Sequence, residues 1–143
     1  ACDIVLAAKS AKFIQSFAKV GLIPDTGGSW HLPHLIGEAR AKGLAMTAEP
    51  LSSEKAESWG LIWKSIDDAD LMQVAREITA NLSKGPTLGL ALTKEAIQTS
   101  WESDLLTHIE KEADYMKRCG ESADYAEGVK AFLQKRSPEF KGH

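Results

Sequence analysis

The sequence predicts an α/β protein in which a few strands are followed by a long helical region. Residues 1–8 form a bounded apolar run containing Ile4 and Val5, which is typical of a buried strand. Only residues 12–17 and 61–66 offer further strands. A buried parallel strand needs neighbours on both edges and cover on both faces. We therefore expect the chain to be the C-terminal part of a longer protein.

Three short helices are expected in the first half of the chain. Residues 30–36 form a helix that Pro33 starts or distorts, and residues 38–46 form another after Gly37. The third opens at Ser52 and stops at Gly60. These elements and the preceding strands make up a first region, residues 1–66.

Four longer helices are expected in residues 67–143, and each carries an apolar stripe at helical spacing. They cover residues 67–84, 87–100, 104–118 and 122–135. Gly85 and Pro86 separate the first two, Asp104 caps the third, and Ser122 is a candidate N-cap for the fourth. The stripe of the third helix is Leu105, Leu106, Ile109, Ala113 and Met116, and that of the fourth is Tyr125, Val129 and Phe132.

Composition narrows the class of protein. The chain is 43% hydrophobic and 26% charged, and its 17 Lys and Arg against 20 Asp and Glu give a net charge of −3. This argues against disorder, and we expect neither a nucleic-acid nor a membrane partner. Cys2 and Cys119 match no disulfide or metal framework, so we expect two unreactive thiols and a cytoplasmic location.

Residues 21–30, Gly-Leu-Ile-Pro-Asp-Thr-Gly-Gly-Ser-Trp, carry the candidate chemistry. Gly27 and Gly28 permit a tight turn before a helix N-terminus, whose backbone N–H groups can face an anion or a developing oxyanion. Asp25 either faces the same cavity or caps the helix, and the residues alone leave both open. Trp30 either lines a pocket or fills the core.

His31 and His34 have a spacing that can hold a metal on a helix, but no other Cys or His lies near them in the sequence. We therefore expect a surface or packing role for both and no metal site.

Several segments together resemble the enoyl-CoA hydratase/isomerase (crotonase) family. They are Ala-Cys-Asp-Ile-Val-Leu-Ala at residues 1–7, Gly-Leu-Ile-Pro at 21–24, Gly27-Gly28, Trp-Gly-Leu-Ile at 59–62, and the ending at 132–142. The resemblance spans essentially the whole chain and matches the second half of a family domain. It implies a crotonase-like fold of the ClpP/crotonase superfamily, of which this chain is the mostly helical C-terminal half.

Two positions point to a branch of the family. Hydratases with two catalytic glutamates carry one of them where this chain has Phe17. Asp25 after Pro24 instead resembles the epoxyphenylacetyl-CoA isomerases of the phenylacetate pathway and their associated enoyl-CoA isomerase activity. The 4-chlorobenzoyl-CoA dehalogenase branch has an aspartate at a similar place that acts as a nucleophile. Asp25 is thus expected to be a proton shuttle, with a nucleophile as the alternative.

The resemblance also implies the substrate and the partners. We expect an acyl-CoA isomerase that moves a proton or double bond, or opens a ring epoxide, on a CoA thioester; an enoyl-CoA hydratase or a dehalogenase-like enzyme is the alternative. No cofactor is expected beyond the coenzyme A of the substrate, and Asp25 is expected to be a base surrounded by Phe17, Leu22 and Trp30. A missing N-terminal half would supply the oxyanion hole, so the isolated chain is expected to be inactive. Residues 67–143 would mediate a homotrimer or hexamer, and the alternative is a remnant that serves only this assembly. The expected substrate-binding residues are Phe17, Leu22, Pro24, Gly27, Gly28 and Trp30; the expected CoA-binding residues are Lys135, Arg136, Phe140 and Lys141, with a solvated basic tail as the alternative.

Overall fold

A computed structural model describes residues 2–143 of the chain. Two compact units are present, the first ending at Ala75 and the second spanning Arg76–His143. The division falls inside helix α4 (Leu71–Ser83). The functional division expected at residue 66 stays a prediction. None of the helices in residues 2–143 combines the length and apolar character needed to cross a membrane.

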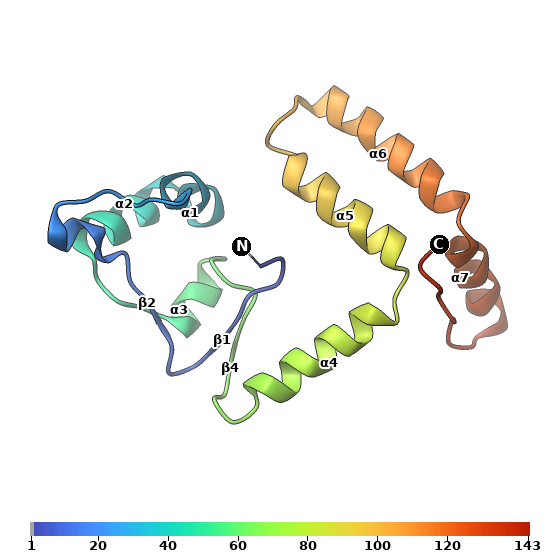
Figure 1. Cartoon of the computed structure of the whole chain (residues 1–143), viewed down its shortest axis with the longest axis horizontal. Coiled ribbons are helices and arrows are strands. Elements are labelled where there is room, and N and C mark those ends of the chain that lie inside the picture. Colours follow the sequence, from blue (N-terminus) through green and yellow to red (C-terminus); the bar gives the residue numbers. More distant parts are fainter. Residues whose placement is uncertain (1) are drawn as a thin grey trace. The chain divides into compact units, whose positions relative to one another are not determined.

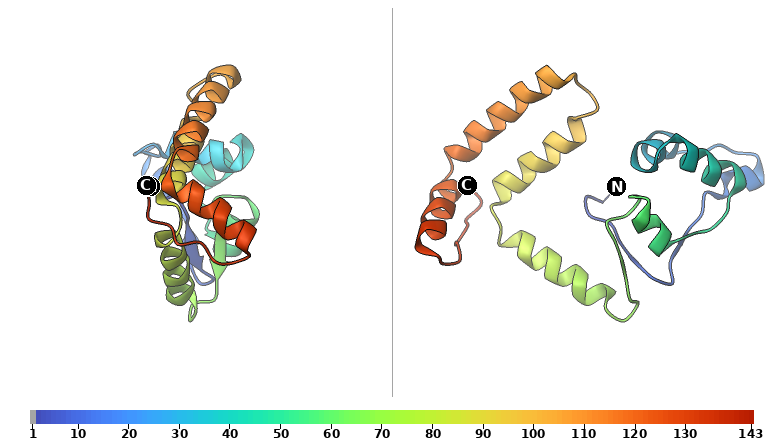
Figure 2. Two further views of the ribbon diagram at one scale, coloured as in Figure 1. Left: turned by 90° about the vertical axis from the view of Figure 1, so that its right-hand side faces the viewer. Right: turned by 180° about the vertical axis from the view of Figure 1, so that it is seen from behind.

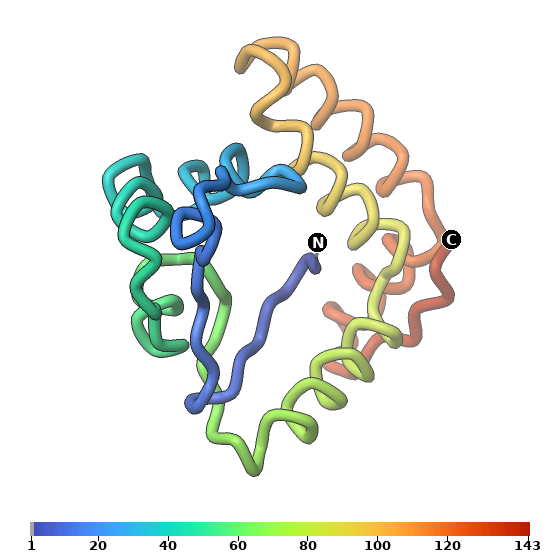
Figure 3. The backbone as a smooth tube through the Cα atoms, turned by 60° about the vertical axis from the view of Figure 1, so that its left-hand side comes forward, coloured from blue at the N-terminus to red at the C-terminus, as the bar shows by residue number. Residues whose placement is uncertain are grey.

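In the first unit, residues 2–75 form four short strands in two separate pairs (Figure 1). Strand β1 (Leu6–Ala8) is parallel to β4 (Lys64–Ile66), and both run in the same direction in Figure 3. Strand β2 (Lys12–Phe13) is antiparallel to β3 (Leu51–Ser52). The parallel pairing agrees with the parallel sheet that the first apolar run implied.

The strand predictions are right in place but wrong in length. Of residues 1–8, only 6–8 pair, because β4 offers three residues; Ala1 lies outside the described residues. The strand expected over 12–17 ends at Phe13, and the chain then forms a 3₁₀ helix, η1 (Ser16–Val20). Strand β3 was not expected at all, since two residues carry no detectable alternation.

Besides η1 and the start of α4, the described part of the first unit contains α1 (Gly28–Ile36), α2 (Glu38–Thr47) and α3 (Ser53–Ser58). They match the three short helices expected, with Ser52 as the N-cap of α3 and Pro33 inside α1. Their buried apolar residues form one core with β1 and β3, made of Ala7, Leu32, Ile36, Ala41, Leu44, Leu51, Ala56 and Ile62.

A fully buried serine joins the strands to α3. Ser53 is 0% exposed, and its hydroxyl lies 2.7 Å from Ser65 Oγ on β4 and 3.3 Å from the carbonyl oxygen of Lys9 beside β1. Buried hydroxyls are tolerated when they are hydrogen-bonded in this way. The contact fixes the register of the parallel pair beneath α3.

The second unit contains α5 (Thr87–Thr99), α6 (Leu105–Gly120) and α7 (Ala123–Gln134). Helices α5 and α6 lie side by side, as Figures 1 and 2 both show. The caps follow the sequence prediction: Asp104 accepts hydrogen bonds from two backbone N–H groups of α6, and Ser122 accepts one from Tyr125 N.

The apolar stripe of α6 is largely exposed in this chain. Leu105, Leu106 and Met116 are 72–74% exposed, and Ile109 is 47% exposed. The helix instead contacts α5 through polar side chains, with Lys111 Nζ donating to Thr99 Oγ1 at 2.9 Å. A hydrogen bond to Glu95, also on α5, raises the pKa of Tyr115.

The stripe of α7 is similarly exposed. Tyr125, Val129 and Phe132 are 43–82% exposed, so this chain does not cover them. Periodicity finds an apolar face correctly, but it carries no information on whether the same chain covers that face.

The C-terminal segment is fastened along α7 by a buried carboxylate, and it turns back beside that helix in Figure 2. Asp124, 3% exposed, accepts hydrogen bonds from Lys141 N at 2.6 Å and Gly142 N at 2.8 Å. Its own N–H donates to the carbonyl oxygen of His143. We call residues 136–143 the C-terminal strap.

Replacing Asp124 should release the strap. Asp124→Ala removes two hydrogen bonds to a carboxylate, each typically worth about 1.5–3 kcal/mol. We expect lost amide exchange protection at Lys141 and Gly142 and a lower melting temperature. Asp114→Ala, an exposed carboxylate on α6, is the control. Unchanged protection in Asp124→Ala would contradict the strap.

Candidate active site

The candidate site begins where the 3₁₀ helix ends. Phe17 lies half-buried in η1, and its carbonyl oxygen accepts a hydrogen bond from Leu22 N at 3.0 Å. Gly21, with φ +73°, ends η1 in the left-handed conformation. A segment without regular secondary structure, which contains Pro24, then leads to Asp25, three residues before the start of α1.

A tight turn joins Asp25 to the first residue of α1. The carbonyl oxygen of Asp25 accepts a hydrogen bond from Gly28 N at 2.7 Å, and the central residues Thr26 and Gly27 have φ of +51° and +79°. Two positive φ values define a type I′ turn, which favours Gly, Asn or Asp at these positions. Gly27 fits this requirement. Thr26 does not, because a β-branched residue with positive φ is strained by about 1–3 kcal/mol.

The Asp25 carboxylate contacts its neighbour in the turn rather than the helix. Thr26 Oγ1 donates to Asp25 Oδ1 at 2.9 Å. The N-cap position of α1 is occupied by Gly27, with no side-chain cap hydrogen bond. The alternative that Asp25 is the N-cap is therefore wrong, and its carboxylate is available for another role.

The apolar surroundings expected for Asp25 are not formed within this chain. Asp25 is exposed, and Leu22 and Trp30 are 62% and 59% exposed. The reason lies in the geometry of α1, which buries Leu32 and Ile36. Trp30 precedes Leu32 by two residues and so faces the opposite side of the helix.

On that outer side, Trp30 packs against the ring of His34, one turn later, with ring centroids 4.6 Å apart. His34 Nδ1 also lies 2.6 Å from the carbonyl oxygen of Trp30. Of the two roles left open for Trp30, filling the core is therefore excluded in this chain.

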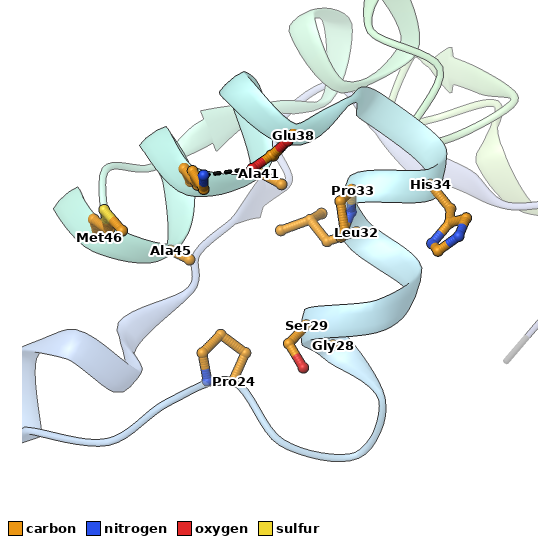
Figure 4. A pocket seen from close by; sticks show the side chains of 11 residues that line it. Pro24, Gly28, Ser29, Leu32, Pro33, His34, Glu38, Ala41, Ala45 and Met46 are labelled. Carbon is orange, nitrogen blue, oxygen red and sulfur yellow. Dashed lines mark hydrogen bonds and ion pairs between the residues drawn. The ribbon is translucent and has the colours of Figure 1, made fainter.

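A cavity of about 510 Å³ lies beside the turn, between Pro24 and the helices α1 and α2 (Figure 4). Pro24 and Gly28 are the two predicted substrate-binding residues that line it. They approach closely: a Cβ on Gly28 would lie 3.3 Å from Pro24 Cβ, so glycine permits this packing. Phe17, Leu22, Gly27 and Trp30 are not in the lining, and their substrate-binding roles stay predictions.

Most residues that line this cavity were not predicted from the sequence. Figure 4 shows Leu32 on α1 facing Ala41 and Ala45 on α2, with Met46 near the end of the helix and a Glu38–Lys42 ion pair at the rim. Alanines four residues apart on α2 were the available signal, because such spacing leaves an open strip on one helix face.

The four predicted CoA-binding residues all belong to the second unit. One of them, Arg136, forms an ion pair with Glu127, which we call the Glu127–Arg136 clamp. Arg136 donates from both terminal nitrogens to the Glu127 carboxylate, at 2.5 and 2.9 Å. Glu139 N donates to the same carboxylate. The Arg136 guanidinium and this N–H lower the pKa of Glu127 to about 2.

The other three residues differ in their exposure. The side chain of Phe140 is half-buried and lines an apolar cavity of about 450 Å³ between α5, α7 and the strap. Lys135 and Lys141 are exposed. Coenzyme A binding by Lys135, Arg136, Phe140 and Lys141 stays a prediction, and for Arg136 it requires competition with Glu127.

The comparison with known protein families decides the class. The family model for enoyl-CoA hydratase/isomerase matches residues 1–143. The chain belongs to the enoyl-CoA hydratase/isomerase family. A crystal structure of an enoyl-CoA hydratase from Bacillus anthracis matches it with a TM-score of 0.94 and 33% identity, over 99% of this chain and 55% of that one. The fold is therefore crotonase-like, as the sequence predicted.

Relatives within the family are named for different activities. The chain is 51% identical to the 1,2-epoxyphenylacetyl-CoA isomerase of Escherichia coli, over 98% of this chain and 53% of the relative. It is 43% identical to a protein of Rhodobacter capsulatus named as a probable enoyl-CoA hydratase, over 99% and 55%. The chain spans about half the length of these relatives.

The Glu127–Arg136 clamp should remain formed when the pH is lowered to mildly acidic values. A carboxylate with a depressed pKa stabilises the fold fully above its unfolded pKa, about 4.3, and loses this effect as the pH falls through the folded value. For Glu127 the loss extends down to about pH 2. We expect the Glu139 amide to stay protected from exchange at pH 4.

Glu127→Ala should lose that protection at every pH, because no side-chain oxygen remains to accept from Glu139 N. Glu110→Ala, an exposed residue on α6, is the control and should behave as the unmodified chain does. Loss of Glu139 protection near pH 4.5 in the unmodified chain would contradict the clamp.

Proposed function

We propose that the chain supplies Asp25 as the proton shuttle of an acyl-CoA isomerase. The observation that carries the proposal is the placement of Asp25: an exposed carboxylate that caps no helix, in a tight turn between two residues of the cavity lining, Pro24 and Gly28. Identity of 51% to an epoxyphenylacetyl-CoA isomerase supports the same branch. Phenylacetate or fatty-acid degradation is the proposed setting.

The proposed reaction moves one proton between two carbons of the substrate. Asp25 removes a proton from the carbon α to the thioester, and the electrons of the broken C–H bond form an enolate. The same carboxyl group returns the proton to the γ carbon, so the double bond moves from the β,γ to the α,β position. Water takes no part, which agrees with Phe17 in place of a glutamate.

The enolate oxygen needs hydrogen-bond donors that are rigidly placed. We propose that these come from a segment preceding this one in the complete enzyme, and that this chain by itself is inactive. We also propose a cytoplasmic location and no cofactor other than the coenzyme A of the substrate.

A hydratase is the second candidate, because a relative at 43% identity is named as one. Two-glutamate hydration needs a carboxylate to hold the attacking water, and Phe17 cannot supply it. A third candidate is dehalogenase-like chemistry, in which Asp25 attacks the substrate as a nucleophile. A remnant that serves only in assembly is the fourth.

Asp25→Asn in the complete enzyme tests the isomerase directly. Asn retains a side-chain oxygen for the Thr26 hydroxyl, so folding and acyl-CoA binding should persist. Loss of a sole acid–base group should lower kcat by about 10²–10⁴-fold or more. Exchange of the α proton with deuterated water should disappear as well, because the same base starts both processes.

Glu49→Gln, at an exposed position after α2, is the matched control and should leave both rates unchanged. Normal α-proton exchange in Asp25→Asn would end the isomerase assignment. A covalent adduct on Asp25 in enzyme denatured during turnover would instead support the nucleophile.

We further propose that the exposed stripes of α6 and α7 are covered in a homotrimer or a dimer of trimers. Exposed apolar surface of this extent is typical of interaction sites. Light scattering of the complete enzyme should give a trimer or hexamer at micromolar concentration. Leu106→Lys should shift it towards smaller species, whereas Asp114→Lys, on the polar side of α6, should not. A monomeric unmodified enzyme would contradict the proposal.

A further inference from the structure

We propose that Thr26 is a positioning residue for Asp25 and that its hydroxyl fixes the orientation of the carboxylate. The inference rests on the proposed role of Asp25 as the base. It is carried by two observations on the same residue: a hydrogen bond from Thr26 Oγ1 to Asp25 Oδ1, and a backbone conformation that threonine disfavours.

The turn itself does not call for a threonine. Position i+1 of a type I′ turn needs positive φ, and Gly, Asn and Asp adopt it far more readily than a β-branched residue. Thr26 is also exposed, so its methyl group adds no core packing. The feature that threonine brings to this position is a hydroxyl group.

The hydroxyl is well suited to holding a carboxylate. A β-branched side chain has few accessible χ1 rotamers, so Oγ1 stays in one place relative to the backbone. The backbone is fixed in turn by the bond from Gly28 N to the Asp25 carbonyl oxygen. With Oδ1 held by Thr26, Oδ2 is the oxygen left to take and return the proton.

The orientation matters because a single group must serve two carbons. A shuttle has to reach the α carbon and then the γ carbon without losing its proton to water. Misplacement of a catalytic group by about 1 Å can cost about a hundredfold in rate. A carboxylate on an exposed turn rotates freely about its χ angles unless a neighbour restrains it.

Three substitutions at one position separate positioning from folding. Thr26→Ser keeps the hydroxyl, Thr26→Val keeps the shape without the hydroxyl, and Thr26→Gly removes both the hydroxyl and the backbone strain. Each is made in the complete enzyme and compared with Asp25→Asn for kcat, KM, α-proton exchange and melting temperature.

We expect Thr26→Ser to retain kcat within about threefold of the unmodified enzyme. Thr26→Val and Thr26→Gly should lower kcat and α-proton exchange by about 10–100-fold with little change in KM. Thr26→Gly should at the same time raise the melting temperature, since glycine adopts positive φ without strain. Activity and stability then move in opposite directions.

A purely structural threonine would give the opposite result for glycine: kcat would follow stability, and Thr26→Gly would be as active as the unmodified enzyme. That outcome, with Asp25→Asn inactive, would overturn the positioning role while leaving the base in place. Full activity in Asp25→Asn would overturn the proposed function itself, whatever the Thr26 variants do.

Discussion

The arrangement of the candidate site depends on two consecutive residues in the left-handed conformation. Thr26 and Gly27 reverse the chain between η1 and α1, and this reversal sets both the direction of α1 and the position of Asp25. It also brings Pro24 against Gly28 at the edge of the cavity. A different turn type would move the Asp25 carboxylate and the adjacent wall of the cavity together. The geometry of the site therefore depends on the conformation of this turn.

Local signals in the sequence predict much of this fold. Asp104 and Ser122 cap their helices, and Gly37 and Pro86 mark the boundaries between helices, because capping and helix breaking depend on a few neighbouring residues. Strand lengths were less predictable, since a strand extends only as far as its partner. The three-residue β4 limits β1 regardless of how apolar residues 1–5 are.

The candidate site was predictable in its position but not in its surroundings. Glycines, a proline and an aspartate before a helix identify the turn from sequence alone. Whether Asp25 lies under Leu22 and Trp30 depends on how α1 is rotated against α2, and that is set by Leu32 and Ile36 packing into the core. Such tertiary choices also decide that the stripe of α6 is exposed while polar residues contact α5.

The C-terminal strap shows why charge alone is a poor guide to ligand binding. Lys135, Arg136 and Lys141 look equivalent in the sequence as a basic end. In the structure the Arg136 guanidinium forms a bidentate pair with Glu127, while the Lys141 backbone is bound by Asp124. A phosphate would have to displace a carboxylate from Arg136, whereas the lysine ammonium groups of Lys135 and Lys141 are exposed to solvent. The lysines are therefore better placed to attract an anion, and the arginine to hold the strap that carries one of them.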